Sequence, residues 1–226
     1  MPEVWAVDVP AEIARMAEHV GRLTADEARR AARFHRDEDR HRFVVARSTR
    51  RVLLARRLGV DPATLVFEAG RYGKPRLRSD AGAAPSFNSS HSGRWVLHAI
   101  ADVEVGVDVE RIRPEFARLD DFLWILSPEE RAVASAAAEP MRASAFATIW
   151  VRKEAYVKAL GEGLSRSLPD IGIVAGDAGP ALAYDRNPGH RAAQWRFVDL
   201  EIDDSHKACV VHAGPRREVV VRAWRS

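Results

Sequence analysis

Three short sequence patterns occur twice in this chain, in the same order and at nearly the same spacing. The copies are Val-Asp-Val at 7–9 and 107–109, Leu-Thr-Ala-Asp-Glu at 23–27 with Leu-Ser-Pro-Glu-Glu at 126–130, and a helix-ending Leu-Gly at 58–59 and 160–161. The first and last leucines are 35 residues apart in one copy (58 − 23) and 34 in the other (160 − 126). Three matches in one order at a near-constant offset predict an ancient internal duplication.

Each copy carries the start and stop signals of helices. Thr24 precedes two acids and predicts a helix N-terminus, and Ser127 stands at the same place in the second copy. Apolar residues then recur at helical spacing from Asp39 to Leu58, and Gly59 ends that helix. A shorter helical pattern covers 11–22. The long helix is the dominant element expected in each half.

Short alternating segments predict strands between and after the helices. The expected strands are 4–9, 65–68, 95–101 with 106–110 as its hairpin partner, and 194–202, 206–213 and 218–224, which complete a second sheet. Residues 168–191 are expected to be extended and rich in turns.

The elements together predict an α+β fold. We expect two similar α/β halves related by a pseudo-twofold, each a long helix packed on a small antiparallel sheet, with the active site in the cleft between them. The N-terminal half would cover 1–105 and the C-terminal half 106–226. No Pro-, Gly- or Ser-rich linker lies near that boundary, so the halves should pack tightly.

Composition narrows the class of protein. The 226 residues are 46% apolar and 30% charged, and no stretch approaches the roughly 20 uncharged apolar residues of a membrane span. The N-terminus shows no export signal, and Cys209 is the sole cysteine, so the chain can form no intrachain disulfide. We expect a cytoplasmic protein that does not enter a membrane.

Arginine dominates the basic residues. Of 35 Lys and Arg, four are Lys and 31 are Arg (35 − 4), many of them within 29–57, and the pI is about 9.3. This half could therefore present a positive face to phosphates or to an acidic protein. A basic nucleic-acid-binding module is the alternative function, but no helix-turn-helix, finger or RNA-binding aromatic motif supports it. No phosphate-binding glycine loop of another nucleotide enzyme is present either.

Two acids and a helical Glu-Lys pair are the residues that could carry chemistry. Asp108 and Glu110 are two apart in a predicted strand, so both carboxylates lie on one face. Paired acids attract a divalent cation, which needs one more contributor and a phosphate ligand, with waters completing its shell. Glu154 and Lys158 share one stripe of the second long helix. Spacing alone is equally typical of a solvated surface pair.

Longer motifs surround these residues. W-x-x-K-E-A-x-x-K-x-x-G-x-G occupies 150–163 and G-V-D-V-E occupies 106–110; the others are RYGKPRL at 71–77, FNSSHSGRW at 87–95 and SPEE at 127–130. Together they resemble the signature of the 4'-phosphopantetheinyl transferase superfamily over about residues 30–165. Length and duplicated layout resemble its larger monomeric branch, of which the surfactin-synthetase activator is the type.

The resemblance implies a specific reaction. Such an enzyme transfers the 4'-phosphopantetheine group of coenzyme A to a serine of an apo carrier protein and releases 3',5'-ADP, with Mg²⁺, or Mn²⁺ in its place. Acyl, peptidyl and aryl carrier proteins of fatty-acid, polyketide or nonribosomal peptide biosynthesis all remain open as partners, because docking has no short signature. We expect a monomer that binds no nucleic acid.

The resemblance also assigns roles to residues. Asp108, Glu110 and Glu154 would hold the metal ion against the coenzyme A pyrophosphate. Glu154, directly or through a water that it orients, would take the serine proton, and Lys158 would neutralise the pyrophosphate. The positions that match the family's coenzyme A contacts are Arg47, Lys74, Pro75, Ser90, His91, Asp108, Lys153 and Lys158.

A few residues stand apart from the pattern. Glu27 appears where relatives of the type enzyme carry a phosphate-contacting lysine, and Arg30 is a second candidate for that contact. Trp124 lies in an apolar stretch that, in the family, is near the docked carrier protein. Three aromatic residues have the helical spacing of a core rather than of a stacking platform: Phe146, Trp150 and Tyr156.

Overall fold

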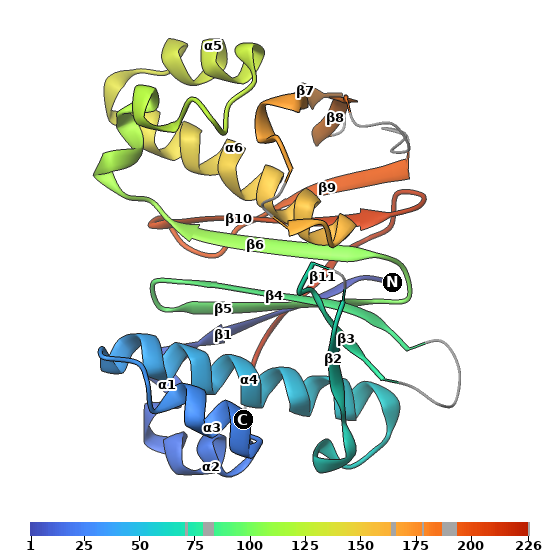
Figure 1. Ribbon diagram of the computed structural model, residues 1–226. Helices are drawn as coiled ribbons and strands as arrows, with labels where there is room; N and C mark the ends of the chain where they lie inside the picture. The colour runs from blue at the N-terminus through green and yellow to red at the C-terminus, as the bar shows by residue number, and fades with distance from the viewer. Residues whose placement is uncertain (71, 79–83, 164–165, 178, 187–193, 226) are drawn as a thin grey trace.

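The structure, a computed structural model, describes residues 1–226 except 71, 79–83, 164–165, 178, 187–193 and 226 (Figure 1). Its helices are α1 (Val9–Glu12), α2 (Met16–Gly21), α3 (Ala25–Ala31), α4 (Asp37–Leu58), α5 (Pro128–Ala136) and α6 (Glu139–Leu160). Its strands are β1 (Glu3–Asp8), β2 (Phe67–Ala69), β3 (Pro75–Leu77), β4 (Ser86–Ser92), β5 (Trp95–Ala101), β6 (Val105–Arg111), β7 (Ile171–Gly176), β8 (Gly179–Asp185), β9 (Trp195–Leu200), β10 (His206–Ala213) and β11 (Val220–Ala223). Arg71 of the RYGKPRL motif, and 178 and 187–191 of the predicted extended segment, lie outside the described residues.

The molecule is α+β, and its main elements stack in four layers (Figure 1). The order is α4, a sheet with strand order β11-β1-β5-β4, a sheet with order β6-β10-β9, and α6. The two sheets face each other through a core of small aliphatic residues, in which Val4 and Leu97 pack with Val107 and Val210. Separate apolar clusters lie between each sheet and its own long helix. The facing surfaces of the two sheets are therefore buried and apolar over this core.

The helix start and stop signals predicted from the sequence are present in the structure. Thr24 and Ser127 each form a capping box with the glutamate three residues on, which starts α3 and α5. Helices α4 and α6 both stop at a left-handed glycine, Gly59 with φ 68° and Gly161 with φ 74°. Only glycine adopts this backbone without strain, so the Leu-Gly pairs are true stop signals.

Several predicted strands pair differently from expectation. The prediction that 106–110 forms a hairpin with β5 is wrong: β6 pairs with β10, and β5 pairs with β1 and β4. The strand near 218–224 does not join the second sheet either, because β11 runs parallel to β1 in the first. Strand β2 starts at Phe67 rather than Leu65, and the helix expected over 11–22 is broken into α1, a 3-10 turn and α2.

Gly106 brings α6 and β6 unusually close together. A Cβ built at this glycine would lie 2.1 Å from the Ala155 carbonyl oxygen and 2.4 Å from the Ala159 amide nitrogen. Real atoms cannot approach that closely, so the absence of a side chain lets the helix settle on the strand. This contact places the last turns of α6, which carry Glu154 and Lys158, against the start of β6.

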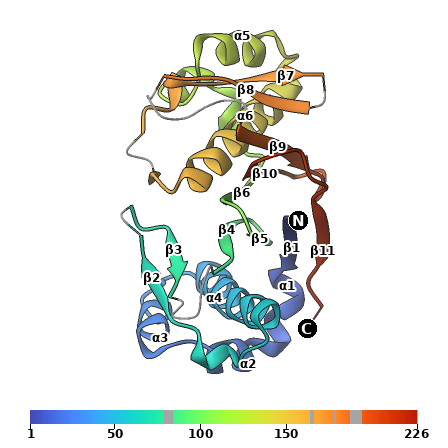
Figure 2. The ribbon, with the colours of Figure 1, turned by 90° about the vertical axis from the view of Figure 1, so that its right-hand side faces the viewer.

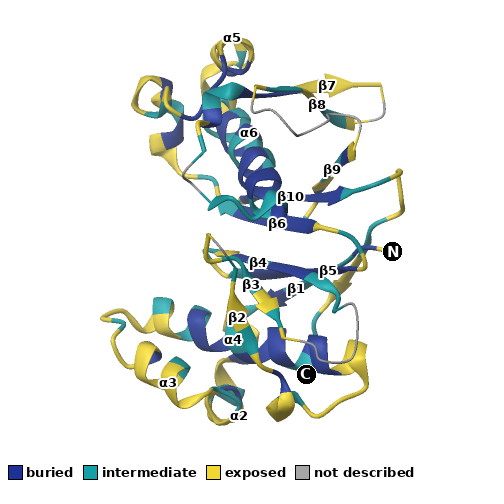
Figure 3. Cartoon of the chain, turned by 45° about the vertical axis from the view of Figure 1, so that its right-hand side comes forward, coloured by how far each residue is buried: buried dark blue, intermediate teal, exposed yellow. Residues whose placement is uncertain are grey.

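Burial follows the layers (Figure 3). β5, β6, β10 and the inward face of α6 are buried, whereas α2 and α3 are largely exposed. The ribbon of β2 and β3 projects from the first half toward the end of α6 (Figure 2). Among the described residues, no helix has the length and apolar composition to cross a membrane.

Candidate active site

Strands β4 and β6 belong to different sheets but are joined by a ladder of side chains. Asn88, Ser90 and Ser92 alternate along β4, so all three point toward β6. Val107 N–H donates to Asn88 Oδ1 at 3.0 Å, and Ser90 Oγ donates to Asp108 Oδ1 at 2.6 Å. Ser92 Oγ donates to Glu110 Oε2 at 2.8 Å. The first half thus holds the carboxylates that the second half supplies.

Lys158 of α6 lies against the same carboxylates. Its ammonium is 2.5 Å from Asp108 Oδ1 and 3.9 Å from Glu154 Oε2, and it also donates to Ser90 Oγ at 3.2 Å. Burial lowers the pKa of Lys158, but the neighbouring acids, Asp108 first, outweigh it and raise the pKa overall. The lysine therefore stays charged between two acids.

The pKa values of Glu154 and Glu110 are both raised. Burial, with the nearby charges of Asp108 and Glu110, raises the pKa of Glu154 to about 7 even though Lys158 opposes the shift. Burial and the Asp108 charge also raise the pKa of Glu110, against hydrogen bonds from Ser92 and Trp150. The charge of Asp108 acts on both Glu154 and Glu110, and that of Glu110 acts on Glu154, so the three carboxylates lie within electrostatic reach.

Two of these acids have a bare oxygen. Within the described residues, Asp108 Oδ2 and Glu154 Oε1 are buried and accept no hydrogen bond. Unsatisfied buried carboxylate oxygens are costly unless a cation approaches them. Among the same residues, no three His, Cys, Asp or Glu side chains close around a metal ion by themselves. The acids fit Mg²⁺ as a partial set of oxygen ligands that phosphate and water would complete.

The first half contributes a cavity of about 330 Å³, called the basic cavity for its three arginines, although Asp26, Glu27 and Glu68 also line it. Arg30, Arg47 and Arg50 line it, together with Phe67 and Pro75. The Arg50 guanidinium stacks over the Phe67 ring at 4.3 Å, and burial lowers the pKa of Arg50 to about 9. Guanidinium groups of this kind suit phosphates, and an aromatic wall suits a flat base.

Glu27 lies in the same cavity and is not a phosphate contact. Its carboxylate caps α3 through the Thr24 amide and lies 3.4 Å from guanidinium nitrogens of both Arg50 and Arg51. The chain therefore neutralises part of the positive charge of this cavity internally. Arg30 and Arg47 remain as the cations that line it beside the Phe43 ring.

His91 connects the basic cavity to the acids. It borders a cleft of about 350 Å³ whose walls come from both halves, with Arg42 on one side and Glu110 and Arg113 on the other. Burial lowers the pKa of His91, and the charges of Arg42, Lys158 and Arg47 lower it further. A histidine among several cations faces a place where negative charge would be stabilised.

The prediction that Lys153 contacts coenzyme A is wrong. Lys153 has no exposed surface; its ammonium lies 2.5 Å from Glu130 Oε2 and donates to the carbonyls of Ile125 and Leu168. Helical spacing did not reveal this, because Lys153 is one residue around the helix from Glu154 and faces the core. It anchors α6 to α5 rather than binding a ligand.

The ammonium of Lys74 is also engaged in the structure. It donates to Glu104 Oε2 at 3.0 Å, Val105 O at 3.2 Å and Ala159 O at 3.0 Å. These partners use its three N–H groups and tie the β2–β3 ribbon to the end of α6 (Figure 2). Lys74 therefore positions the ribbon, and phosphate binding by its ammonium would require these bonds to break.

Sequence reasoning missed Asn88 and Ser92. The segment gave no period-two signal, because five consecutive polar residues, 88–92, follow Phe87 and do not mark which face of the strand is turned to β6. Trp150 was expected in the core; it is only half-buried and donates from Nε1 to Glu110 Oε1 at 3.4 Å. The core positions of Phe146 and Tyr156, 1% and 0% exposed, are confirmed.

Comparison with known proteins covers both halves of the chain. The profile of the 4'-phosphopantetheinyl transferase superfamily matches residues 104–211, and a profile described as 4'-phosphopantetheinyl transferase, N-terminal, matches residues 11–102. The chain is 30% identical to the 4'-phosphopantetheinyl transferase HetI of Nostoc, over 93% of this chain and 87% of that protein. It is 29% identical to a 4'-phosphopantetheinyl transferase of Bacillus subtilis, over 84% and 83%.

A solved structure is similar to part of the chain. The holo-(acyl-carrier-protein) synthase from Bacillus anthracis, in complex with CoA (3',5'-ADP), superposes with a TM-score of 0.41 at 25% identity and covers 49% of this chain and 95% of its own. The sequence relatives extend through both halves and most of their own length. The chain belongs to the 4'-phosphopantetheinyl transferase superfamily, in its larger branch.

Proposed function

We propose that this enzyme transfers the 4'-phosphopantetheine group of coenzyme A to a serine of an apo carrier protein and releases 3',5'-ADP. One observation carries the proposal: three mutually coupled carboxylates and a charged lysine meet where β6, α6 and β4 converge. The relatives named as 4'-phosphopantetheinyl transferases support the same reaction. In phosphoryl transfer the protein acts mainly by positioning groups and neutralising charge.

Asp108, Glu110 and Glu154 would hold Mg²⁺, or Mn²⁺, beside the pyrophosphate. A bound divalent ion would supply positive charge to the pyrophosphate oxygens. Asp108 Oδ2 and Glu154 Oε1, bare among the described residues, are the oxygens that we assign to it. Ser90 and Ser92 fix the remaining oxygens of Asp108 and Glu110, so the ligands would turn little on binding.

Glu154 and Lys158 would carry the proton and the charge. A carboxylate whose pKa lies near 7 through burial can accept the proton of the attacking serine at neutral pH. Lys158, protonated beside Asp108, would face the pyrophosphate and stabilise the charge that develops on the leaving 3',5'-ADP. The acceptor and the cation are one helical turn apart on α6.

The nucleotide end of coenzyme A would lie on the first half. Arg30 and Arg47 in the basic cavity are our candidates for the 3'-phosphate, and Pro75 and Phe67 would border the base. His91 would lie between this cavity and the acids. The support is the continuity of cationic side chains from α4 to the carboxylates.

Carrier proteins would dock on the second half beside the acids. Trp124 and Met141 are 58% and 57% exposed, and the Trp124 ring packs edge-to-face on Trp150 with centroids 6.0 Å apart. Trp150 in turn reaches Glu110. A carrier domain seated on this apolar surface would have its serine close to Glu154. We propose that the enzyme acts as a monomer, because both walls of the cleft come from one chain. We also propose that it acts in the cytoplasm.

We further propose that residues 1–105 and 106–226 are halves related by a pseudo-twofold. Supporting the proposal, Arg51 and Lys153 each lie seven residues before the helix-ending leucine (58 − 51 and 160 − 153). Each approaches the capping-box glutamate of the preceding helix and donates to loop carbonyls. The two matching profiles also meet between residues 102 and 104. The C-terminal strand β11 crosses back to the first sheet.

The test is a mass shift. Purified chain with Mg²⁺ and coenzyme A should add about 340 Da, the transferred group, to an apo carrier protein. Acyl, peptidyl and aryl carriers should be tried in parallel, with Glu154→Gln as the matched inactive control. Unchanged mass across all three carrier types would refute the proposed function. The nucleic-acid alternative has no support from the comparisons and is not proposed.

A further inference from the structure

The tip of the β4–β5 hairpin lies beside the acids. Ser92 ends β4 and Trp95 begins β5, with Gly93 and Arg94 as the turn between them. Ser92 accepts from the Arg111 amide at 3.0 Å while its hydroxyl donates to Glu110. A shift of this tip would therefore move the hydroxyl that holds Glu110.

A loop of the second half grips the tip through Asp203. Trp95 Nε1 donates to Asp203 Oδ2 at 2.6 Å. The other oxygen, Oδ1, accepts from the Ser205 amide at 2.8 Å and lies 2.9 Å from His206 Nδ1. Burial raises the pKa of Asp203, but these hydrogen bonds outweigh it and hold the pKa well below its ordinary range. The carboxylate is thus fixed as an acceptor.

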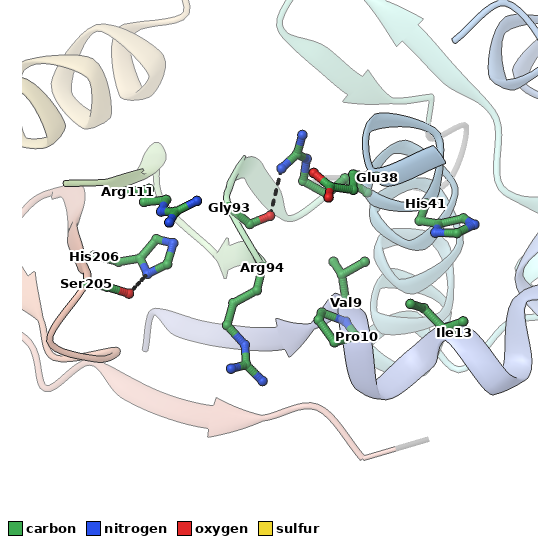
Figure 4. Close-up of a pocket in the computed structure, with 11 residues that line it drawn as sticks. Val9, Pro10, Ile13, Glu38, His41, Gly93, Arg94, Arg111, Ser205 and His206 are labelled. Carbon is green, nitrogen blue, oxygen red and sulfur yellow. Dashed lines mark hydrogen bonds between the residues drawn. The ribbon is translucent and has the colours of Figure 1, made fainter. Parts of the chain in front are cut away.

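His206 closes the grip from the other side. The ring is 4% exposed, and a Cβ built at Gly93 would lie 2.4 Å from its Nε2 (Figure 4). Because a carboxylate only accepts, Nδ1–H donates to Asp203 and Nε2 faces Gly93. In the part of the chain that the structure describes, Nε2 has no hydrogen-bond partner. Gly93, with φ 55°, is the residue that permits both the turn and the contact.

The first half holds the tip independently. Arg42 of α4 donates from Nη1 to Gly93 O at 2.8 Å, and Val9 N–H donates to Arg94 O at 2.9 Å. These hydrogen bonds fix the tip to its own half and do not set its distance from β6. The loop with Asp203 and His206 leads directly into β10, which pairs with β6. Besides the hydrogen bonds of Ser92, it is therefore a second connection between the tip and the strand of the acids.

We propose that Asp203, His206 and Trp95 form a positioning clamp that sets Ser90 and Ser92 on the metal-binding carboxylates Asp108 and Glu110. The clamp touches neither substrate nor metal; it acts through the serine ladder. It rests on the proposed function only in naming the carboxylates as metal ligands. A cavity of about 470 Å³ lies behind the tip, between His206, Arg94 and Ile13, so the tip has room to move when the clamp is opened (Figure 4).

Trp95→Phe and Asp203→Ala remove the same hydrogen bond from opposite sides, because neither phenylalanine nor alanine supplies the lost donor or acceptor. Both variants should raise the Mg²⁺ concentration for half-maximal transfer by about three- to tenfold. Groups in direct contact with metal ligands usually change metal affinity by more than this, and the clamp acts on the ligands only through the serines. The KM for coenzyme A should change by less than about twofold, because the basic cavity is distant from the clamp. The double variant should be no worse than the worse single variant.

The matched control is Trp224→Phe. The Trp224 indole N–H also lies buried in the described structure, but it has no acceptor there, so its removal deletes the same atoms without breaking a bond. This variant should keep the wild-type Mg²⁺ dependence. Equal effects of Trp95→Phe and Trp224→Phe would overturn the clamp, since they would reflect lost packing alone.

A second readout needs no turnover. Mn²⁺ titrated into the full chain with coenzyme A, followed by electron paramagnetic resonance, should bind more weakly in both clamp variants by the same factor. Amide hydrogen exchange at Ser92 and Arg111 should also accelerate in them. Unchanged Mn²⁺ affinity with unchanged exchange would refute the clamp even if transfer is observed. If transfer fails altogether while Mn²⁺ binding responds, the proposed function fails and the clamp stands.

Discussion

The two long helices share a frame but differ in chemistry. α4 and α6 are both 22 residues long and end at left-handed glycines. Arg51 in α4 and Lys153 in α6 stand at matching places and are both buried against a capping-box glutamate, Glu27 or Glu130. A buried cation that also donates to loop carbonyls fixes each short helix to its long one. The frame therefore explains why Lys153 is structural.

The next positions differ. Val52 and Arg56 of α4 stand where α6 has Glu154 and Lys158, and Arg56 is exposed. The strands differ as well: Asp8 of the first Val-Asp-Val makes an ion pair with Arg94, whereas Asp108 of the second is 2% exposed and meets Lys158. The first copy has a single matching acid, which pairs with an arginine near the surface, and the second copy gathers three acids in one cluster. Matching positions in the two copies thus have the same backbone setting but carry side chains with different roles.

Glu154→Gln should give the largest effect. Loss of the proposed base should lower kcat by about 10² to 10⁴-fold. The paired variant Val52→Thr, at the matching place in α4, should stay within about twofold of wild type. Both are measured as initial rates of carrier modification at saturating Mg²⁺. Folding of Glu154→Gln should be intact, because a neutral amide replaces a carboxyl that burial disfavours in its charged form. A wild-type rate for Glu154→Gln would end the assignment.

Lys153→Met should destabilise the fold more than Arg51→Met. The first leaves Glu130, 3% exposed, without its cation, which typically costs about 3–5 kcal/mol. The second leaves Glu27, 16% exposed and still beside Arg50, so the loss should be about 1–2 kcal/mol. Urea denaturation of both variants measures the free energy of unfolding. The reverse order would contradict the conclusion that Glu130 depends on its cation more than Glu27 does.

Lys158→Ala and Arg56→Ala compare the last turns of the two helices. Removing the ammonium beside Asp108 should lower kcat/KM by about 10- to 1000-fold, in line with loss of one charge-stabilising group. Arg56 is exposed and stacks over the Trp224 ring, with its guanidinium carbon 5.1 Å from the ring centroid, so its loss should leave the rate unchanged. Steady-state kinetics with varied coenzyme A separates the two outcomes. A loss of rate in Arg56→Ala would show that both copies take part.

Acid should destabilise the fold through a buried histidine of the first half. His98 is 1% exposed beneath α4; Thr49 Oγ1 donates to Val45 O, so His98 Nε2–H donates to Thr49 Oγ1 and Nδ1 accepts from Ser89. Burial lowers the pKa of His98 to about 3, whereas in the unfolded chain it is about 6.5. Below about pH 6.5 the histidine binds a proton in the unfolded state but not in the folded state. The free energy of unfolding therefore decreases as the pH is lowered.

At pH 5 this difference should cost about 2 kcal/mol relative to pH 7. His98→Gln should lose less stability over the same range, measured by urea denaturation at both pH values. The second half has no counterpart to this contact among the described residues, because α6 rests on Cys209 and Val211. A variant as acid-sensitive as wild type would assign the pH dependence elsewhere.

The sequence predicted local features well and long-range pairing poorly. The capping boxes at Thr24 and Ser127 and the glycine stops at Gly59 and Gly161 depend on neighbouring residues, and all are confirmed. Strand partners depend on contacts across the chain, so the pairing of β6 with β10 could not be predicted from the segment itself. Proximity in sequence suggested the wrong partner, β5.

The site shows the same limit. The alternation of Asp108 and Glu110 with valines predicted one acidic face, and the structure places both beside β4. The face on which Lys153 lies could not be predicted, because a helix buried on most sides gives no polar face for orientation. Glu130, its buried partner, is a helix-capping residue whose second role appears only in the folded chain.

We expect a divalent ion to bind to the second copy and not to the first. The most direct test is Mn²⁺ binding to the full chain with coenzyme A, followed by electron paramagnetic resonance in wild type, Asp108→Asn, Glu154→Gln and Val52→Thr. We predict one site, weakened by at least about tenfold in the two acid variants and unchanged in Val52→Thr. Wild-type Mn²⁺ affinity in both Asp108→Asn and Glu154→Gln would contradict it.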